Sequence, residues 1–215
     1  TIKDVDALDG AVSLREAVIA ANTDQPHNDA PAGSGTDTIV FAAGLTGTIR
    51  LASVVRLDSN LNLVGPGADV IAIAKDPDVD VDGILTVGLR RTVRISGVAV
   101  RDGLTRPNSF LGGALLTTFQ SLVTLYDCVF ENNHARNRMG VGSAIYADDG
   151  TLAAINCAFV NNSCGSGPVY TNGAVLSFFN CTFANNRSTG DGAPAGALAI
   201  AFNDHVSAVV DCTND

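Results

Sequence analysis

The sequence predicts an all-β protein, a single-stranded right-handed parallel β-helix of about seven coils behind an N-terminal amphipathic capping helix. Three observations predict this fold: turn-forming residues are abundant, a cysteine-containing unit recurs in the second half, and a helix signal precedes the first strand-like run. The 215 residues suffice for one domain with a sizeable core. We place the cap at residues 1–36 and the parallel β-helix at residues 37–215.

The composition is typical of many short strands joined by tight turns. Apolar residues make up 46% of the chain, charged residues only 16%, and there are 22 glycines. Glycine, asparagine and aspartate favour turns, and the chain is too apolar to be disordered. A net charge of −9 with only two lysines, Lys3 and Lys75, excludes a nucleic-acid partner. No apolar run is long enough to cross a bilayer, so we expect no direct membrane insertion.

A repeated unit of the form Asp/Asn-Cys-x-Phe-x-Asn-Asn carries the fold prediction. Successive cysteines lie 29, 24 and 31 residues apart, so the units share a core and differ in their loops. A unit this short buries its apolar face only by stacking on its neighbours. Three complete units and the start of a fourth occupy residues 127–133, 156–162, 180–186 and 211–214.

Each unit has the pattern of a short strand, a corner and a second short strand. Apolar residues alternate before each cysteine, which is the period of a strand face. The Asp or Asn before the cysteine suits a corner, the Phe after it points inward, and stacked Asn side chains can hydrogen-bond from coil to coil. We therefore predict a structural ladder of Cys128, Cys157, Cys181, Cys212, Phe130, Phe159, Phe183, Asn133, Asn162 and Asn186.

The ladder cysteines admit three interpretations: metal ligands, disulfides between adjacent coils, or buried reduced thiols. Adjacent coils bring Cα atoms within disulfide range. Their place between two inward residues nevertheless favours small buried thiols. Cys164, in the loop of residues 163–166, is the cysteine that we expect to be reactive or to pair between chains.

A helix signal near the start of the chain predicts the cap. Ser13 and Glu16 have the spacing of a capping box, and apolar residues follow at helical spacing up to Asn22. A helix over residues 13–22 would cover the open end of the first coil, which otherwise invites edge-to-edge pairing. The cap residues are Ser13, Leu14, Glu16 and Val18.

Several stretches resemble bacterial surface β-helix proteins with the CSLREA N-terminal signature. They are residues 13–17 (Ser-Leu-Arg-Glu-Ala), 21–22, 37–41, 44–49 and 65–68. The later Asn-Cys-x-Phe-x-Asn-Asn units are similar to the repeats of polymorphic outer-membrane, adhesin-like proteins. The chain has Val12 where the signature usually has its cysteine. The resemblance implies an extracellular or cell-surface protein.

Alternating aspartates form a candidate calcium site. Asp78, Asp80 and Asp82 precede Gly83 in the order of a calcium-binding loop, but Leu89 stands where the loop usually has a glutamate. The alternative is a solvated turn whose charges block edge pairing. We expect no other cofactor.

A carbohydrate-active enzyme, either a polysaccharide lyase or a glycoside hydrolase, is the alternative function, because such enzymes also use parallel β-helices. That chemistry needs paired carboxylates, or calcium with a basic residue. Residues 148–150 (Asp-Asp-Gly) indicate a turn and residues 203–205 (Asn-Asp-His) a corner, while His27 and His134 lie alone in polar loops. We therefore predict no catalytic residues.

The residues two positions before each cysteine indicate an interaction role. They should point outward and form an apolar stripe of Tyr126, Ile155, Phe179 and Val210. Such a stripe is covered by a loop of the same chain, such as residues 101–109 or 187–195, or by another molecule.

The chain also stops inside a repeat, and an uncapped coil favours end-to-end assembly into fibres. We expect a non-enzymatic, secreted or surface-displayed structural or adhesin-like protein that binds itself or a surface glycan or protein.

Overall fold

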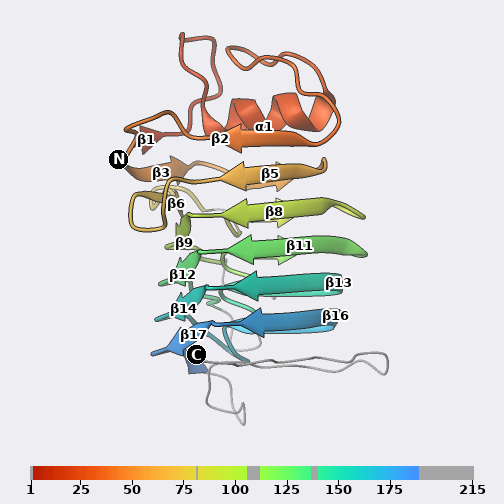
Figure 1. Cartoon of the computed structure of the whole chain (residues 1–215). Helices are drawn as coiled ribbons and strands as arrows, with labels where there is room; N and C mark the ends of the chain where they lie inside the picture. The colour runs from red at the N-terminus through yellow and green to blue at the C-terminus, as the bar shows by residue number, and fades with distance from the viewer. Residues whose placement is uncertain (1, 81, 106–111, 137–139, 189–215) are drawn as a thin grey trace.

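The chain is an all-β parallel solenoid with a helix at its N-terminal end, as the sequence predicts (Figure 1). The computed structural model describes residues 2–80, 82–105, 112–136 and 140–188. Every pair of strands named within these ranges runs parallel. The predicted fourth repeat, with Val210 and Cys212, lies outside the described residues.

The strands form three faces around one interior, which we call sheets 1, 2 and 3. Sheet 1 contains β2 (Asp37–Val40), β5 (Leu61–Val64), β8 (Thr92–Ser96), β11 (Ser121–Tyr126) and the second halves of β13 (Ile145–Ile155) and β16 (Val169–Phe179). Sheet 2 contains β1 (Ile2–Lys3), β3 (Gly47–Leu51), β6 (Ile71–Lys75), β9 (Ala99–Arg101), β12 (Val129–Glu131), β14 (Ala158–Val160) and β17 (Thr182–Ala184). Sheet 3 contains β4 (Val55–Leu57), β7 (Leu85–Val87), β10 (Leu115–Thr117) and the first halves of β13 and β16.

Two further short strands, β15 (Ser163–Cys164) and β18 (Arg187–Ser188), pair at one corner of the later coils. The helix α1 (Leu14–Thr23) lies across the N-terminal end of the stack (Figure 1). The core is a single apolar cluster that runs from α1 to the last described coil. The chain therefore forms its core by stacking similar coils.

Left-handed residues make the corners of the repeated unit. The residue before each of the three described ladder cysteines has a positive φ: 52° at Asp127, 55° at Asn156 and 50° at Asn180. Asp and Asn tolerate this conformation because their short polar side chains hydrogen-bond locally. The first Asn of each Asn-Asn pair adopts it too, so each unit turns the chain twice.

Gly97 has a φ of 62° and separates β8 from β9. The structure differs from the sequence-based expectation at two boundaries. The turn expected at residues 148–150 lies inside β13, where a register shift and a φ of 119° at Gly150 bend the strand between sheets 3 and 1. The helix ends at Thr23, one residue later than expected, with Asp24 left-handed.

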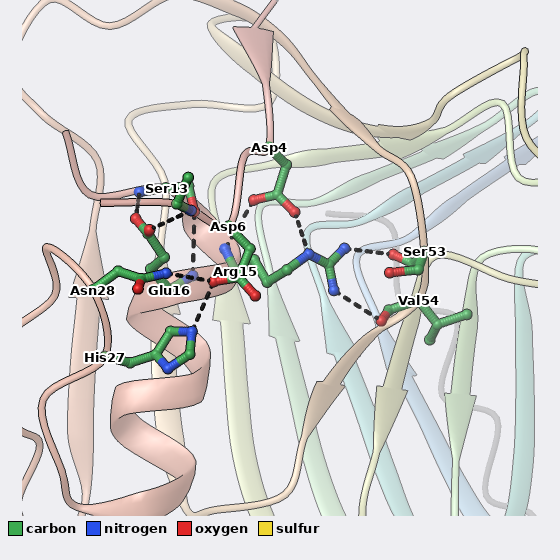
Figure 2. Close-up of polar contacts among 10 residues, drawn as sticks. Asp4, Asp6, Ser13, Arg15, Glu16, His27, Asn28, Ser53 and Val54 are labelled. Atoms are coloured by element: carbon green, nitrogen blue, oxygen red, sulfur yellow. Dashed lines mark hydrogen bonds and ion pairs between the residues drawn. The ribbon is translucent and has the colours of Figure 1, made fainter. Parts of the chain in front are cut away.

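A polar network fixes the cap to the first coil (Figure 2). The Ser13 hydroxyl accepts the Glu16 N–H at 3.2 Å, and the Glu16 carboxylate accepts the Ser13 N–H at 2.9 Å, which completes the capping box. The Arg15 guanidinium donates to the main-chain oxygen of Ser53 at 2.8 Å and pairs with the buried carboxylate of Asp4 at 2.9 Å. Leu14 and Val18 of α1 are buried and belong to the core cluster.

Candidate interaction surface

The outward stripe predicted from the sequence runs in register across sheet 1. Tyr126 pairs with Ile155, and Ile155 pairs with Phe179, so the three side chains stack on successive coils. Tyr126 and Ile155 are half-buried and Phe179 is exposed. The same column continues through Ser96 to Val64 and Val40 at the N-terminal end.

The outer side of sheet 1 is more apolar than the predicted stripe alone. Leu122 and Val175 lie four residues before Tyr126 and Phe179, in a second, parallel column in which Thr151 stands between them. Five exposed large apolar residues lie on this side: Val40, Val64, Leu122, Val175 and Phe179. We call this outer side of sheet 1 the apolar face. Continuing the count by twos from each cysteine would have found Leu122 and Val175.

The apolar face carries no acidic side chain among its described outward residues, although the whole chain has a net charge of −9. Its one cation is Arg94, whose guanidinium carbon lies 4.1 Å from the centre of the Tyr126 ring. This cation–π contact covers part of the arginine charge with an aromatic ring. The column between the two apolar columns is small or polar, with Thr124, Ala153 and Ser177 in register. The face is therefore nearly flat and nearly neutral.

The interior ladder has the stacking that its sequence pattern suggests. The rings of Phe130 and Phe159 are parallel with centres 5.4 Å apart, and those of Phe159 and Phe183 are 4.7 Å apart. The side-chain amide of Asn133 donates to Asn162 at 3.0 Å, and that of Asn162 donates to Asn186 at 3.1 Å. These ladder residues have structural roles and do not form the surface.

The three ladder cysteines that the structure describes are free thiols between the two strands of their units. Cys128 and Cys157 are buried, and Cys181 is half-buried. Donation of the Cys157 S–H to Cys128, together with burial, raises the pKa of Cys157 to about 12. The pKa of Cys181 is raised as well, by donation to Cys157 and by burial.

Cys164 differs from the expectation of a reactive loop cysteine. It lies in β15 and is only 1% exposed. Its sulfur accepts the Gly167 N–H at 3.0 Å, which folds the loop back over it. The Cys164 thiol is therefore buried, although the polar sequence around it indicated an accessible cysteine.

The calcium candidates lie in the turn that follows β6. The carboxylate of Asp76 accepts the Asp78 N–H at 3.0 Å, so this aspartate closes the turn. Asp78 and Asp80 are exposed, and Asp82 is partly buried. Within the part of the chain that the structure describes, no group of three or more His, Cys, Asp or Glu residues is arranged to hold a metal ion. The calcium site stays a prediction from the sequence.

The two histidines singled out in the sequence have partners. His27 Nε2 lies 2.7 Å from the Asp6 carboxylate in the cap (Figure 2). His134 Nδ1 lies 2.6 Å from the Ser163 hydroxyl on the next coil. Among the described residues, no carboxylate hydrogen-bonds to the His134 ring, so the pair lacks the third group of a catalytic triad.

A shallow groove on sheet 2 was not predicted from the sequence. It has a volume of about 370 Å³ and is lined by Asp69, Arg101 and Glu131 above a floor of alanines. The Arg101 guanidinium donates to the Thr48 hydroxyl at 2.7 Å and to the Glu131 carboxylate at 3.2 Å. Arg101 and Glu131 directly follow the inward Val100 and Phe130, which are in register. Because both residues stand one position after an inward residue, the sequence could have predicted that they lie side by side on the outer side of sheet 2.

In residues 2–80, 82–105, 112–136 and 140–188, no helix has the length and apolar character needed to cross a membrane. Comparisons with protein-family models, curated proteins and solved structures found no significant match to this chain.

Proposed function

We propose that this chain is a non-enzymatic, secreted or surface-displayed scaffold that makes adhesive contacts with further copies of itself through the apolar face. The observation that carries the proposal is the in-register stack of Tyr126, Ile155 and Phe179 on an outer face that lacks acidic residues. Exposed apolar surface of this kind marks interaction sites. Copies of an acidic chain repel each other least where a neutral face meets a neutral face.

The extracellular assignment rests on the resemblance to CSLREA-type surface proteins and adhesin-like repeats. The right-handed sense of the coils is part of the same proposal. It is supported by the parallel pairing of every strand named in the described ranges, because crossover connections between parallel strands are right-handed in about 98% of cases.

The size of the apolar face indicates weak, multiple contacts. Six strands about 4.8 Å apart, with about five residues of about 3.3 Å each, give a face of roughly 400 Å². A stable complex typically buries about 800 Å² on each partner, so one pair of faces holds only transiently. Many copies displayed together gain strength by avidity. This behaviour suits an adhesive surface more than a permanent dimer.

Sedimentation velocity over a concentration series tests the proposal. We expect the weight-average mass of the wild-type chain to rise with concentration, and Tyr126→Ser or Phe179→Ser to abolish the rise. Leu8→Ser is the matched control, because Leu8 is 76% exposed in the cap, away from the apolar face. A wild-type chain that stays monomeric at every concentration contradicts the proposal. Association that survives both serine variants also contradicts a contact through the apolar face.

The alternative, a carbohydrate-active enzyme, is favoured by one observation, the groove on sheet 2. Its lining includes two carboxylates, Asp69 and Glu131, and the basic Arg101, which contacts Glu131. Release of reducing or unsaturated sugar ends from a panel of acidic polysaccharides, lost in Glu131→Gln, would support this function. No release from any polysaccharide would rule it out for that panel.

A further inference from the structure

The first strand of sheet 1 has an open edge. β2 pairs with β5 on one side, and no other described strand pairs with its opposite side. Sheet 2 differs at the same end of the solenoid, because β1 pairs with β3 and covers its edge. The chain thus adds a strand to one sheet and leaves the neighbouring sheet open.

The hydrogen-bond alternation of sheet 1 tells which main-chain groups face the open edge. In β11, the Leu122 N–H donates to Arg91 of the preceding coil. Directly after β11, the Asp127 N–H donates to Ile155 of the following coil. Residues two apart in a strand point their main-chain groups to the same side. Thr38 and Val40 are in register with Thr124 and Tyr126, which share the direction of Leu122. The N–H and C=O groups of Thr38 and Val40 therefore face the open edge.

A groove follows this edge between β2 and α1. One hollow of about 580 Å³ is mostly apolar and is lined by residues that include Val12, Phe41 and Leu45. A second hollow of about 300 Å³ extends toward Ala21 and Asp37. The two hollows share four lining residues, which are Val12, Ala17, Ile39 and Val40. The small side chains of Ala17 and Ala21 line the groove on its α1 side. Figure 1 shows α1 lying over β2.

The core beside the groove lacks a complete cover. Ile39 is only half-buried, whereas its register partners Leu63 and Ile95 are 1% and 0% exposed. Each deeper residue of this column is covered by the residue of the coil before it. A strand added along β2 would place one side chain over Ile39 and bury it to the same degree.

The surroundings of the groove are acidic. Asp37 lines one hollow, whereas Asp4, which lines the other, is buried and already paired with Arg15. The cap carries further aspartates at positions 6, 9, 24 and 29. An added strand with basic side chains is therefore favoured over a neutral or acidic one.

We propose that the groove between α1 and β2 binds an extended basic peptide from a partner protein as an added parallel strand. Main-chain groups of the peptide pair with Thr38 and Val40, one apolar side chain covers Ile39, and a flanking lysine faces Asp37. Strand addition at an open edge is an established mode of peptide recognition. This site is separate from the apolar face, so it does not depend on the proposed self-adhesion.

Fluorescence anisotropy with a labelled, end-blocked peptide of alternating lysine and valine or isoleucine tests the proposal. We expect saturable binding below about 1 mM. We expect at least about a tenfold loss of affinity when alternate peptide nitrogens are methylated, because methylation removes the donors of the added strand. A peptide with glutamate in place of each lysine should bind more weakly than the lysine peptide, because the aspartates around the groove repel it.

Two protein variants separate this site from the rest of the molecule. Ala17→Met fills the groove from its α1 wall, so we expect it to weaken peptide binding by about tenfold or more. Phe179→Ser changes only the apolar face and should leave the peptide affinity unchanged. We also expect slower amide hydrogen exchange at Thr38 and Val40 in the peptide complex. Absence of binding, or equal binding of the methylated peptide, overturns the proposal. A peptide-free dimer that Ala17→Met dissociates would also overturn it, in favour of a second copy as the occupant.

Discussion

The middle coils and the N-terminal end of the solenoid hold together in different ways. In the middle, Phe159 is 0% exposed and lies between the rings of Phe130 and Phe183, so each layer covers the next with a similar side chain. At the N-terminal end no described strand of sheet 1 precedes β2, and Ile39 is covered only in part. There the chain relies on a helix held by directed polar contacts such as Arg15 to Ser53. A stack of repeats thus stabilises its interior by repetition and needs different chemistry at its end.

The strongest way to break the interior is to remove one ring of the ladder. Phe159→Ala deletes a fully buried ring with a stacked neighbour on each side, so we expect the free energy of unfolding to fall by about 4 kcal/mol. Urea denaturation followed by circular dichroism measures this change. Phe179→Ala is the matched control on the outer side of the sheet and should cost less than about 1 kcal/mol. Equal losses for the two variants would contradict an inward ladder.

The amide ladder gives the next largest effect. The Asn162 side chain donates to Phe130 O at 2.9 Å and to Asn186 at 3.1 Å, and it accepts the Asn133 N–H at 3.0 Å. Asn162→Leu leaves these buried groups without partners, so we expect a loss of about 3 kcal/mol in the same denaturation experiment. Asn161→Gly is the control: Asn161 is exposed and has a φ of 57°, which glycine adopts freely. A tolerated Asn162→Leu would show that the ladder adds nothing to stability.

Destabilising the N-terminal cap should lower the free energy of unfolding by less than either ladder variant does. Arg15→Met keeps the length of the side chain but removes the contacts to Ser53 and to the buried Asp4 carboxylate. We expect a loss of about 2 kcal/mol that is confined to the cap. Hydrogen exchange measured by mass spectrometry should show faster exchange in α1 and unchanged exchange in β11 to β14. Uniformly faster exchange would mean that the cap and the coils unfold as one unit.

The pH dependence of the cap sharpens this test. Burial raises the pKa of the Asp4 carboxyl above its ordinary value of 3.8, although the Arg15 N–H and guanidinium partly oppose the shift. The folded chain therefore keeps this proton to a higher pH than the unfolded chain. The contribution of Asp4 to the free energy of unfolding is largest below pH 3.8 and falls as pH rises through the pKa of the folded form. Arg15→Met should extend this fall to higher pH, and Asp4→Asn in the same chain should abolish it.

The smallest expected effect concerns the ladder cysteines, and it is seen in their chemical reactivity and not in the stability of the fold. The pKa of about 12 at Cys157 keeps its thiol protonated at pH 8, and burial blocks access to it. We expect iodoacetamide at pH 8 to label Cys157 only after unfolding in urea, as read by mass spectrometry of digested peptides. Rapid labelling of Cys157 in the folded protein would show that solvent reaches the ladder cysteines.

The sequence predicted what depends on local pattern. The Asp or Asn before each cysteine identified the corners, and the alternation before Cys128 identified the inward and outward sides of β11. These features recur in each unit because the same residue types meet the same geometric demand. The capping box of Ser13 and Glu16 could be predicted for the same reason, because it depends on two residues three positions apart.

Features that depend on packing between distant segments could not be predicted in this way. The polar sequence around Cys164 indicates a loop, but pairing of β15 with β18 buries the thiol. Residues 148–150 have the composition of a turn, yet neighbouring strands hold them within β13. The groove beside β2 depends on how α1 lies over the first coil, which no local pattern encodes.

Methyl NMR spectra recorded over a dilution series test the central claim most directly, namely that the apolar face is the contact surface. We predict that the methyl signals of Ile155 and Val175 shift with protein concentration, while those of Leu8 and Leu89 stay fixed although both side chains are exposed. Signals of Ile155 and Val175 that do not change, or shifts confined to other surfaces, would contradict it.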